Sequence, residues 1–175
     1  MDGSGASHRR RALWGTALFG LAPLTVAGVM PWSLTRWQVQ RPVPGGLPAR
    51  WVGGVLVAAG AVGVADSFRR FAVEGVGTPA PVAPTRHLVV TGMYRYVRNP
   101  MYVATWSAIV GQGLVLGQPK LFVYAAVTAV PVVAFVKLYE EPTLARTFGA
   151  EYEQYRRTVP GWWPLRCLSH RVVVH

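Results

Sequence analysis

Long stretches without charged residues alternate with short polar segments along this chain. Residues 12–35 and 99–119 contain no charged side chain across 24 and 21 positions. A helix needs about 20 mostly apolar residues to cross a bilayer core, so both windows are long enough. Two shorter windows, 51–65 and 121–136, could also span. The window 121–136 becomes long enough if the Lys137 side chain extends toward the interface. For 51–65 the alternative is a buried core helix. The pattern predicts an all-α membrane bundle of about four transmembrane helices.

Basic residues are distributed unevenly between the segments that join these windows. With the N-terminus in the cytoplasm, 14 of the 18 Lys and Arg residues fall on the cytoplasmic side and 4 on the outer side. An excess of Lys and Arg in cytoplasmic loops is the usual orientation signal of membrane proteins. We therefore expect both termini in the cytoplasm. A chain rich in Ala, Gly, Val and Arg further suggests a bacterial inner membrane.

Composition excludes several classes of function. Hydrophobic residues make up 51% of the chain and charged residues 14%, whereas soluble domains average about 25% charged residues. The net charge is +11, yet the basic residues flank apolar windows instead of forming one basic face, which argues against nucleic acid as a partner. A single cysteine, Cys167, and four scattered histidines predict neither a disulfide nor a metal site. Oligomeric state has no signal in the sequence.

The segment between the second and third windows, residues 71–98, is too long for a bare connector. Three prolines impose extended chain on it, but it also carries apolar and aromatic residues that should pack: Leu88, Val89, Val90, Tyr94 and Tyr96. We divide the chain accordingly into residues 1–71, a tail with the first two helices, and residues 72–175, the functional core.

The polar C-terminal region carries apolar residues at helical spacing. Leu144, Phe148, Tyr152 and Tyr155 are separated by four, four and three positions, which places them on one face of a helix. This predicts a C-terminal amphipathic helix. Trp162 and Trp163 follow it and suit a membrane interface.

Two polar clusters border the last two windows. Residues 91–102, TGMYRYVRNPMY, enter the third window, and Asn99 followed by Pro100 is typical of a helix start, whose free N–H groups can face an anion. An interfacial belt of Tyr and Arg is the alternative interpretation. Glu140 and Glu141 are the only adjacent acidic pair, and Pro142 predicts a break or kink there.

The predicted topology brings both clusters to the cytoplasmic side. Together they offer carboxylates for a cation and arginine or helix N–H groups for an anion, and S-adenosyl-L-methionine carries that pattern of charge. Gly111, Gly113 and Gly117 only superficially resemble a nucleotide-binding loop. No strand precedes these glycines, so we expect them to serve helix packing.

From about residue 86 to 160 the sequence resembles the isoprenylcysteine carboxyl methyltransferase family of integral membrane methyltransferases, which includes bacterial phospholipid methyltransferases. The matching parts are HLVVTGMYRYVRNPMY, a hydrophobic hairpin, and EEPTLARTFGAEYEQYRRTVP. Family members often have His where this chain has Asn99. The resemblance implies that S-adenosyl-L-methionine is held by Leu88, Val89, Tyr94, Arg98, Asn99, Pro100, Tyr102 and Glu140.

The resemblance also bears on the methyl acceptor. Family enzymes that act on prenylated cysteine have an arginine four residues before the first glutamate, where this chain has Val136. The expected reaction is methyl transfer to a lipophilic or small carboxylate, thiol or amine, with Tyr94 or Glu141 taking the proton from an amine. The alternatives are an NADPH-dependent membrane reductase of the sterol-reductase type and a non-catalytic protein that binds lipid head groups.

Overall fold

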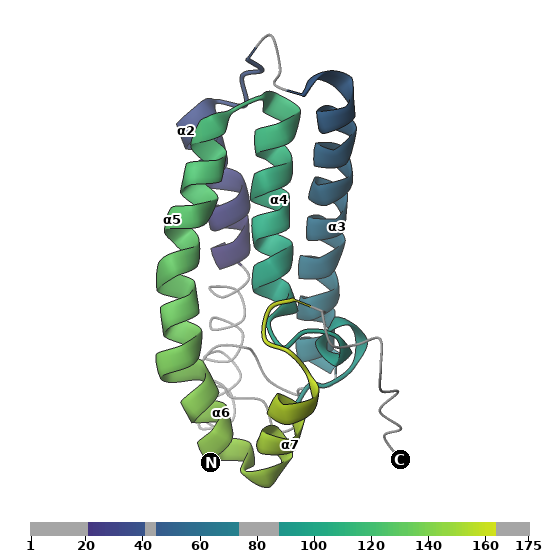
Figure 1. The fold of residues 1–175 in the computed structure, drawn as a ribbon, viewed down its shortest axis with the longest axis vertical. Coiled ribbons are helices and arrows are strands. Elements are labelled where there is room, and N and C mark those ends of the chain that lie inside the picture. Colours follow the sequence, from purple (N-terminus) through teal and green to yellow (C-terminus); the bar gives the residue numbers. More distant parts are fainter. Residues whose placement is uncertain (1–20, 41–44, 74–87, 164–175) are drawn as a thin grey trace, which may run out of the picture.

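The computed structural model describes residues 21–40, 45–73 and 88–163, and every regular element in those ranges is helical. Apolar helices lie side by side in an elongated bundle (Figure 1). They are η1 (Thr25–Val29) continued by α2 (Met30–Thr35), α3 (Gly46–Val73), α4 (Pro100–Leu116) and α5 (Pro119–Phe135). The prediction of an all-α fold is confirmed.

Two helical stretches are long and apolar enough to cross a membrane, Gly46–Phe71 and Pro119–Phe148, whereas Leu21–Thr35 and Pro100–Leu116 are shorter apolar helices. The first predicted window, residues 12–35, lies partly outside the described residues. The doubtful window 51–65 belongs to α3, which is longer than its charge-free part because it continues through charged residues at both ends. Only 22% of its apolar window is buried, so α3 is no core helix.

Short helices gather at the end of the bundle where α4 begins. They are η2 (Gly92–Arg95), η3 (Val136–Glu140), α6 (Glu141–Phe148) and α7 (Ala150–Thr158). The single amphipathic helix predicted here is wrong, because Gly149, at φ 54° and ψ −123°, separates α6 from α7. This backbone conformation is accessible essentially only to glycine. The predicted apolar face nevertheless packs together, as Tyr152, Tyr155 and Val159 form a cluster with Leu144 and Phe148.

Two prolines follow π-helical turns. η1 ends two residues before Pro31, and η3 ends two residues before Pro142. A proline ring clashes with the carbonyl four residues earlier in an α-helix, and the wider π turn moves that carbonyl away. The irregularity expected before Pro142 is thus a π turn inside a continuous helical stretch, not a break.

Pro31 also leaves backbone carbonyls without a donor, because it has no N–H group. The carbonyls that its N–H would serve, in an α or a π turn, are those of Ala27 and Val26. The Gln112 side chain on α4 donates to the Ala27 oxygen at 2.7 Å, and the Tyr124 hydroxyl on α5 donates to the Val26 oxygen at 2.9 Å. Neighbouring helices thus satisfy the groups that the proline frees, as an apolar medium demands.

Helices α3 and α4 approach each other closely. A Cβ atom on Gly60 would lie 2.6 Å from the Ala104 carbonyl oxygen, and one on Gly111 would lie 2.6 Å from the Gly53 carbonyl oxygen. Small residues that let backbones approach are typical of helix contacts in membranes. The prediction of a packing role is confirmed for Gly111 and Gly113, since a Cβ on Gly113 would lie 3.1 Å from the Phe122 ring, whereas Gly117 instead ends α4 at φ 67°.

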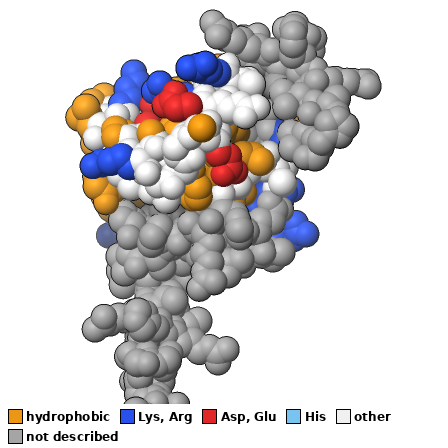
Figure 2. All heavy atoms as spheres, turned by 90° about the horizontal axis from the view of Figure 1, so that it is seen from below, with side chains coloured by type: hydrophobic (Ala, Val, Ile, Leu, Met, Phe, Trp, Pro, Cys, Tyr) orange, Lys and Arg blue, Asp and Glu red, His pale blue; other side chains and the backbone are white. Residues whose placement is uncertain are grey.

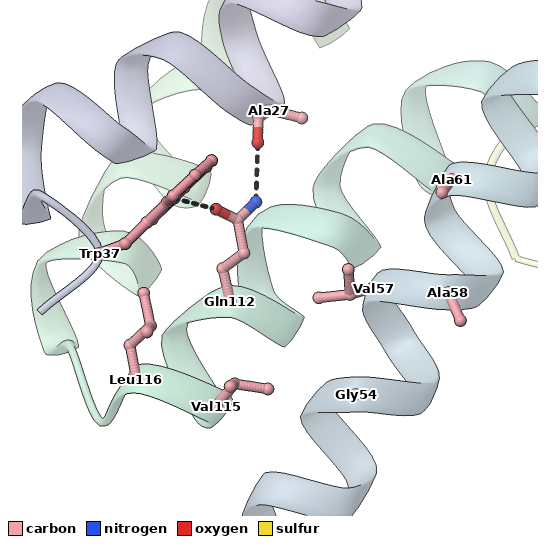
Figure 3. A pocket seen from close by; sticks show the side chains of 9 residues that line it. All are labelled: Ala27, Trp37, Gly54, Val57, Ala58, Ala61, Gln112, Val115 and Leu116. Atoms are coloured by element: carbon pink, nitrogen blue, oxygen red, sulfur yellow. Dashed lines mark hydrogen bonds between the residues drawn. The ribbon is translucent and has the colours of Figure 1, made fainter. Parts of the chain in front are cut away.

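An apolar groove of about 660 Å³ lies far from the start of α4, between η1, α3 and α4. Figure 3 shows Gln112 at its edge, where its amide donates to Ala27 and accepts a hydrogen bond from the Trp37 indole at 3.2 Å. Gln112 is 13 residues along α4 from Asn99, which corresponds to about 20 Å of helix. The groove therefore lies apart from both predicted polar clusters.

The α3–α4 contact predicts opposite effects for two glycines of one helix. Gly60→Ala is expected to lower the free energy of unfolding by about 1–3 kcal/mol, because the added Cβ overlaps α4. Gly54 has nothing within 4 Å of an added Cβ, so Gly54→Ala should leave stability unchanged or raise it by up to about 1 kcal/mol. Thermal melting of both variants in one detergent measures the difference. Equal melting temperatures would contradict the close approach.

Candidate active site

The two predicted polar clusters meet where α4 begins and η3 ends. The Tyr102 hydroxyl, in the first turn of α4, donates to the Glu140 Oε2 atom at 3.1 Å. Glu140 is the last residue of η3, to which α5 leads back from the far end of the bundle. The hairpin of α4 and α5 therefore joins residues that are 38 positions apart.

Arg98 connects the start of α4 to α6 and α7. One guanidinium nitrogen lies 3.0 Å from the Glu141 Oε1 atom, and the same nitrogen donates to the Tyr152 hydroxyl at 3.3 Å. The Arg98 side chain is only 15% exposed, and its Nε atom is buried without a hydrogen-bond partner. The two adjacent glutamates thus have separate contacts, Glu140 with Tyr102 and Glu141 with Arg98.

Asn99 is the N-cap residue of α4 and Pro100 is its first helical residue, as the sequence predicts, but Asn99 does not cap the helix through its side chain. Its side chain makes no capping bond; instead its amide donates to the Gly161 carbonyl at 3.1 Å, and its backbone N–H donates to the same oxygen at 3.2 Å. The Arg98 backbone N–H donates to the Pro160 carbonyl at 2.9 Å. The backbone N–H groups of Arg98 and Asn99 are therefore both taken by the chain itself. The cause is that residues 159–162 return to α4 after α7.

Tyr94 lies in η2 and is buried between α3 and α7. Its carbonyl accepts a hydrogen bond from the Tyr155 hydroxyl at 2.7 Å, and its ring meets Phe71 edge to face at 5.6 Å. Burial raises the pKa of Tyr94 well above its usual value, a hydrogen bond shared with Ser67 acts against this, and the nearby Glu140 charge adds to it. The Tyr94 hydroxyl is therefore protonated at neutral pH.

The other predicted cofactor residues lie around this centre. Val89 is 6% exposed, and Leu88 packs on the cluster of Tyr152 and Tyr155. Pro100 is buried as the first residue of α4. All eight predicted residues are thus at one end of the bundle, although Leu88 and Asn99 direct their side chains into packing and a backbone hydrogen bond.

Sequence reasoning missed two features here. Trp162 stacks on Trp106 with ring centroids 5.4 Å apart and tilts against Tyr102 at 6.3 Å, so it belongs to this site and not only to an interface. The second feature is an ion pair on α3: Arg70 lies 2.7 Å from Asp66 and donates a hydrogen bond to the Thr91 hydroxyl at 2.7 Å. The spacing of Asp66 and Arg70 by four positions was the available signal for this pair.

Charges of both signs gather at this end of the molecule. Figure 2, seen from below, shows acidic and basic side chains close together among apolar ones. Helices α6 and α7 carry Glu141, Arg146, Glu151, Glu153, Arg156 and Arg157. Among the described residues no group of His, Cys, Asp and Glu is arranged to hold a metal ion.

The apolar helices, with a polar and aromatic site at one end, place this protein in the class of helical membrane proteins. Comparison with known families identifies its family within that class. The sequence model of the phospholipid methyltransferase family matches residues 48–151, which include α4, α5, α6 and all of α3 but its first two residues. The chain belongs to this family of membrane methyltransferases.

Two curated relatives agree with this assignment. The chain is 39% identical over 83 residues to the protein-S-isoprenylcysteine O-methyltransferase of Schizosaccharomyces pombe, a match that covers 45% of this chain and 34% of that protein. It is 30% identical over 66 residues to the phosphatidylethanolamine N-methyltransferase of Phaeosphaeria nodorum, covering 38% of this chain and 7% of that protein. The chain thus matches about a third or less of each relative's length.

The largely buried Arg98–Glu141 pair is expected to contribute more to stability than the exposed Arg156–Glu153 pair. Glu141→Gln leaves the largely buried guanidinium without its anion and should lower the free energy of unfolding by about 1–2 kcal/mol. Glu153→Gln removes an ion pair between exposed side chains, Arg156 and Glu153, and should change stability by less than about 0.5 kcal/mol. Thermal melting compares the two variants. An equal loss of stability in both would contradict a stabilising role of the Arg98–Glu141 pair.

Proposed function

We propose that the protein is an S-adenosyl-L-methionine-dependent methyltransferase that transfers a methyl group to a lipophilic or small acceptor arriving from the bilayer. The observation that carries this proposal is the hydrogen bond between Tyr102 and Glu140. It joins the two sequence clusters whose ordered combination resembles the cofactor-binding motif of the family. Membership of a methyltransferase family supports the same reaction.

The residues present suit the methyl donor chemically. Glu140 offers a carboxylate to a positive group or a ribose hydroxyl, and the buried Arg98 Nε atom is a donor that lacks an acceptor. Tyr94, Pro100, Leu88 and Val89 would contribute apolar contacts, and Asn99 would hold the backbone of Gly161 against the site. When bound, S-adenosyl-L-methionine supplies a methyl group already activated on a sulfonium.

The task of the protein is then alignment and exclusion of water. Well-oriented reactants can gain roughly 7–11 kcal/mol from positioning alone. A carboxylate or thiolate acceptor needs no general base, whereas an amine must lose a proton. Glu141 is the better candidate for that proton, since burial keeps Tyr94 protonated and suited only to donating a hydrogen bond.

Several acceptors fit this site. The position expected to hold an arginine in enzymes that act on prenylcysteine is Val136, which is 1% exposed at the start of η3. A carboxylate acceptor would therefore have to be held by another group. We propose a carboxylate, thiol or amine on a lipophilic or small molecule, with the site on the cytoplasmic side of four spans and both termini in the cytoplasm.

Cofactor binding is tested by calorimetric titration of S-adenosylhomocysteine into the detergent-solubilised protein. Micromolar binding is expected, and Glu140→Gln should weaken it roughly tenfold or more, because a charge-assisted hydrogen bond is worth about 1.5–3 kcal/mol. Glu151→Gln changes an exposed glutamate of α7 and should bind like the wild type. Wild-type protein that binds NADPH or phospholipid but not S-adenosylhomocysteine would overturn the proposal in favour of a reductase or a lipid-binding protein.

A further inference from the structure

The segment that follows α7 is fastened to the start of α4. We name residues 159–162 the strap. The Pro160 carbonyl accepts a hydrogen bond from the Arg98 N–H at 2.9 Å, and the Gly161 carbonyl accepts from the Asn99 N–H and side-chain amide at 3.2 and 3.1 Å. In Figure 1 this yellow segment rises beside the lower end of α4. Three hydrogen bonds therefore fix the backbone on which Trp162 stands.

The strap places the Trp162 ring beside the candidate site. The ring stacks on Trp106 at 5.4 Å and 30°, and it lies 6.3 Å from the ring of Tyr102, which hydrogen-bonds Glu140. Its neighbour Trp163 is 70% exposed, so the two tryptophans have different surroundings. Trp163 suits a membrane interface, whereas Trp162 lies against Tyr102, the residue whose hydroxyl contacts Glu140.

Among the residues that the structure describes, Glu140 is the acidic group of this site without a salt bridge to Lys or Arg. Arg98 pairs with Glu141, and Arg70 pairs with Asp66. Within residues 21–40, 45–73 and 88–163, no Lys or Arg forms a salt bridge with Glu140, whose contact is the neutral Tyr102 hydroxyl. A half-buried carboxylate is costly without a positive partner. Aromatic faces attract cations as well, and tryptophan does so most strongly.

We propose that Glu140, Tyr102 and Trp162 form a subsite for a cationic group, and that Trp162 is a binding residue of the enzyme. This inference rests on the proposed function, in which the cation is the sulfonium of S-adenosyl-L-methionine. The subsite would favour the charged methyl donor over the neutral thioether product. That preference helps exchange of product for substrate after each methyl transfer.

The test compares the affinities of S-adenosyl-L-methionine and S-adenosylhomocysteine, which differ at the sulfur by one methyl group and one positive charge. Trp162→Leu keeps an apolar side chain but removes the ring, and it should reduce the preference for the charged ligand at least about threefold. Trp162→Phe should retain part of that preference. Trp163→Leu, the matched control at the exposed neighbour, should keep the wild-type ratio.

Melting temperatures establish whether each variant folds. If Trp162→Leu does not fold, Glu140→Gln decides, because it should weaken the charged ligand more than the neutral one. An equal loss of both ligands in these variants, or no loss in either, would overturn the cation subsite. Wild-type protein that binds neither ligand would instead overturn the proposed function, so the two failures are distinguishable.

Discussion

The site depends on the hairpin in which α4 and α5 run side by side and return the chain to the end where α4 begins. Both helices are 17 residues long, and the π turn of η3 carries the chain a little further. Glu140 lies 21 residues from Pro119, whereas Tyr102 lies 14 residues from Leu116, so the second leg extends past the start of α4. The Tyr102 hydroxyl nevertheless reaches the Glu140 carboxylate. Neither polar cluster contains the whole set of groups, and the close approach of α3 holds α4 in place.

Adjacent residues of one helix acquire different roles through this geometry. Successive side chains on a helix point about 100° apart, so Glu140 turns to Tyr102 and Glu141 turns to Arg98. Within the part of the chain that the structure describes, the first carboxylate has no basic partner, while the second neutralises a largely buried guanidinium. Adjacency in the sequence therefore hides a difference between a carboxylate that contacts a neutral hydroxyl and one that pairs with a largely buried guanidinium.

Much of the fold could be predicted from local signals. Charge-free windows located the apolar helices, and the shared sidedness of two polar clusters anticipated the contact of Tyr102 with Glu140. Other features depend on partners distant in the chain. Asn99 is the N-cap residue of α4 as predicted, but the acceptor of its side-chain amide, Gly161, lies 62 residues away and has no local signal. The helical spacing of the apolar residues from Leu144 to Tyr155 continues across Gly149, so it predicted one helix. Gly149 was the local signal that α6 ends and α7 begins there.

Pro31 shows how hydrogen bonds between helices can fix the position of one helix where apolar packing alone does not specify it. The carbonyls it leaves without a donor accept from Gln112 and Tyr124, which belong to two different helices. These contacts set both the rotation and the axial position of the N-terminal helix. A residue with an N–H at position 31 would compete with Gln112 for the Ala27 oxygen. Pro31 and Gln112 are therefore an energetically coupled pair, and the effect of replacing one depends on which residue occupies the other position.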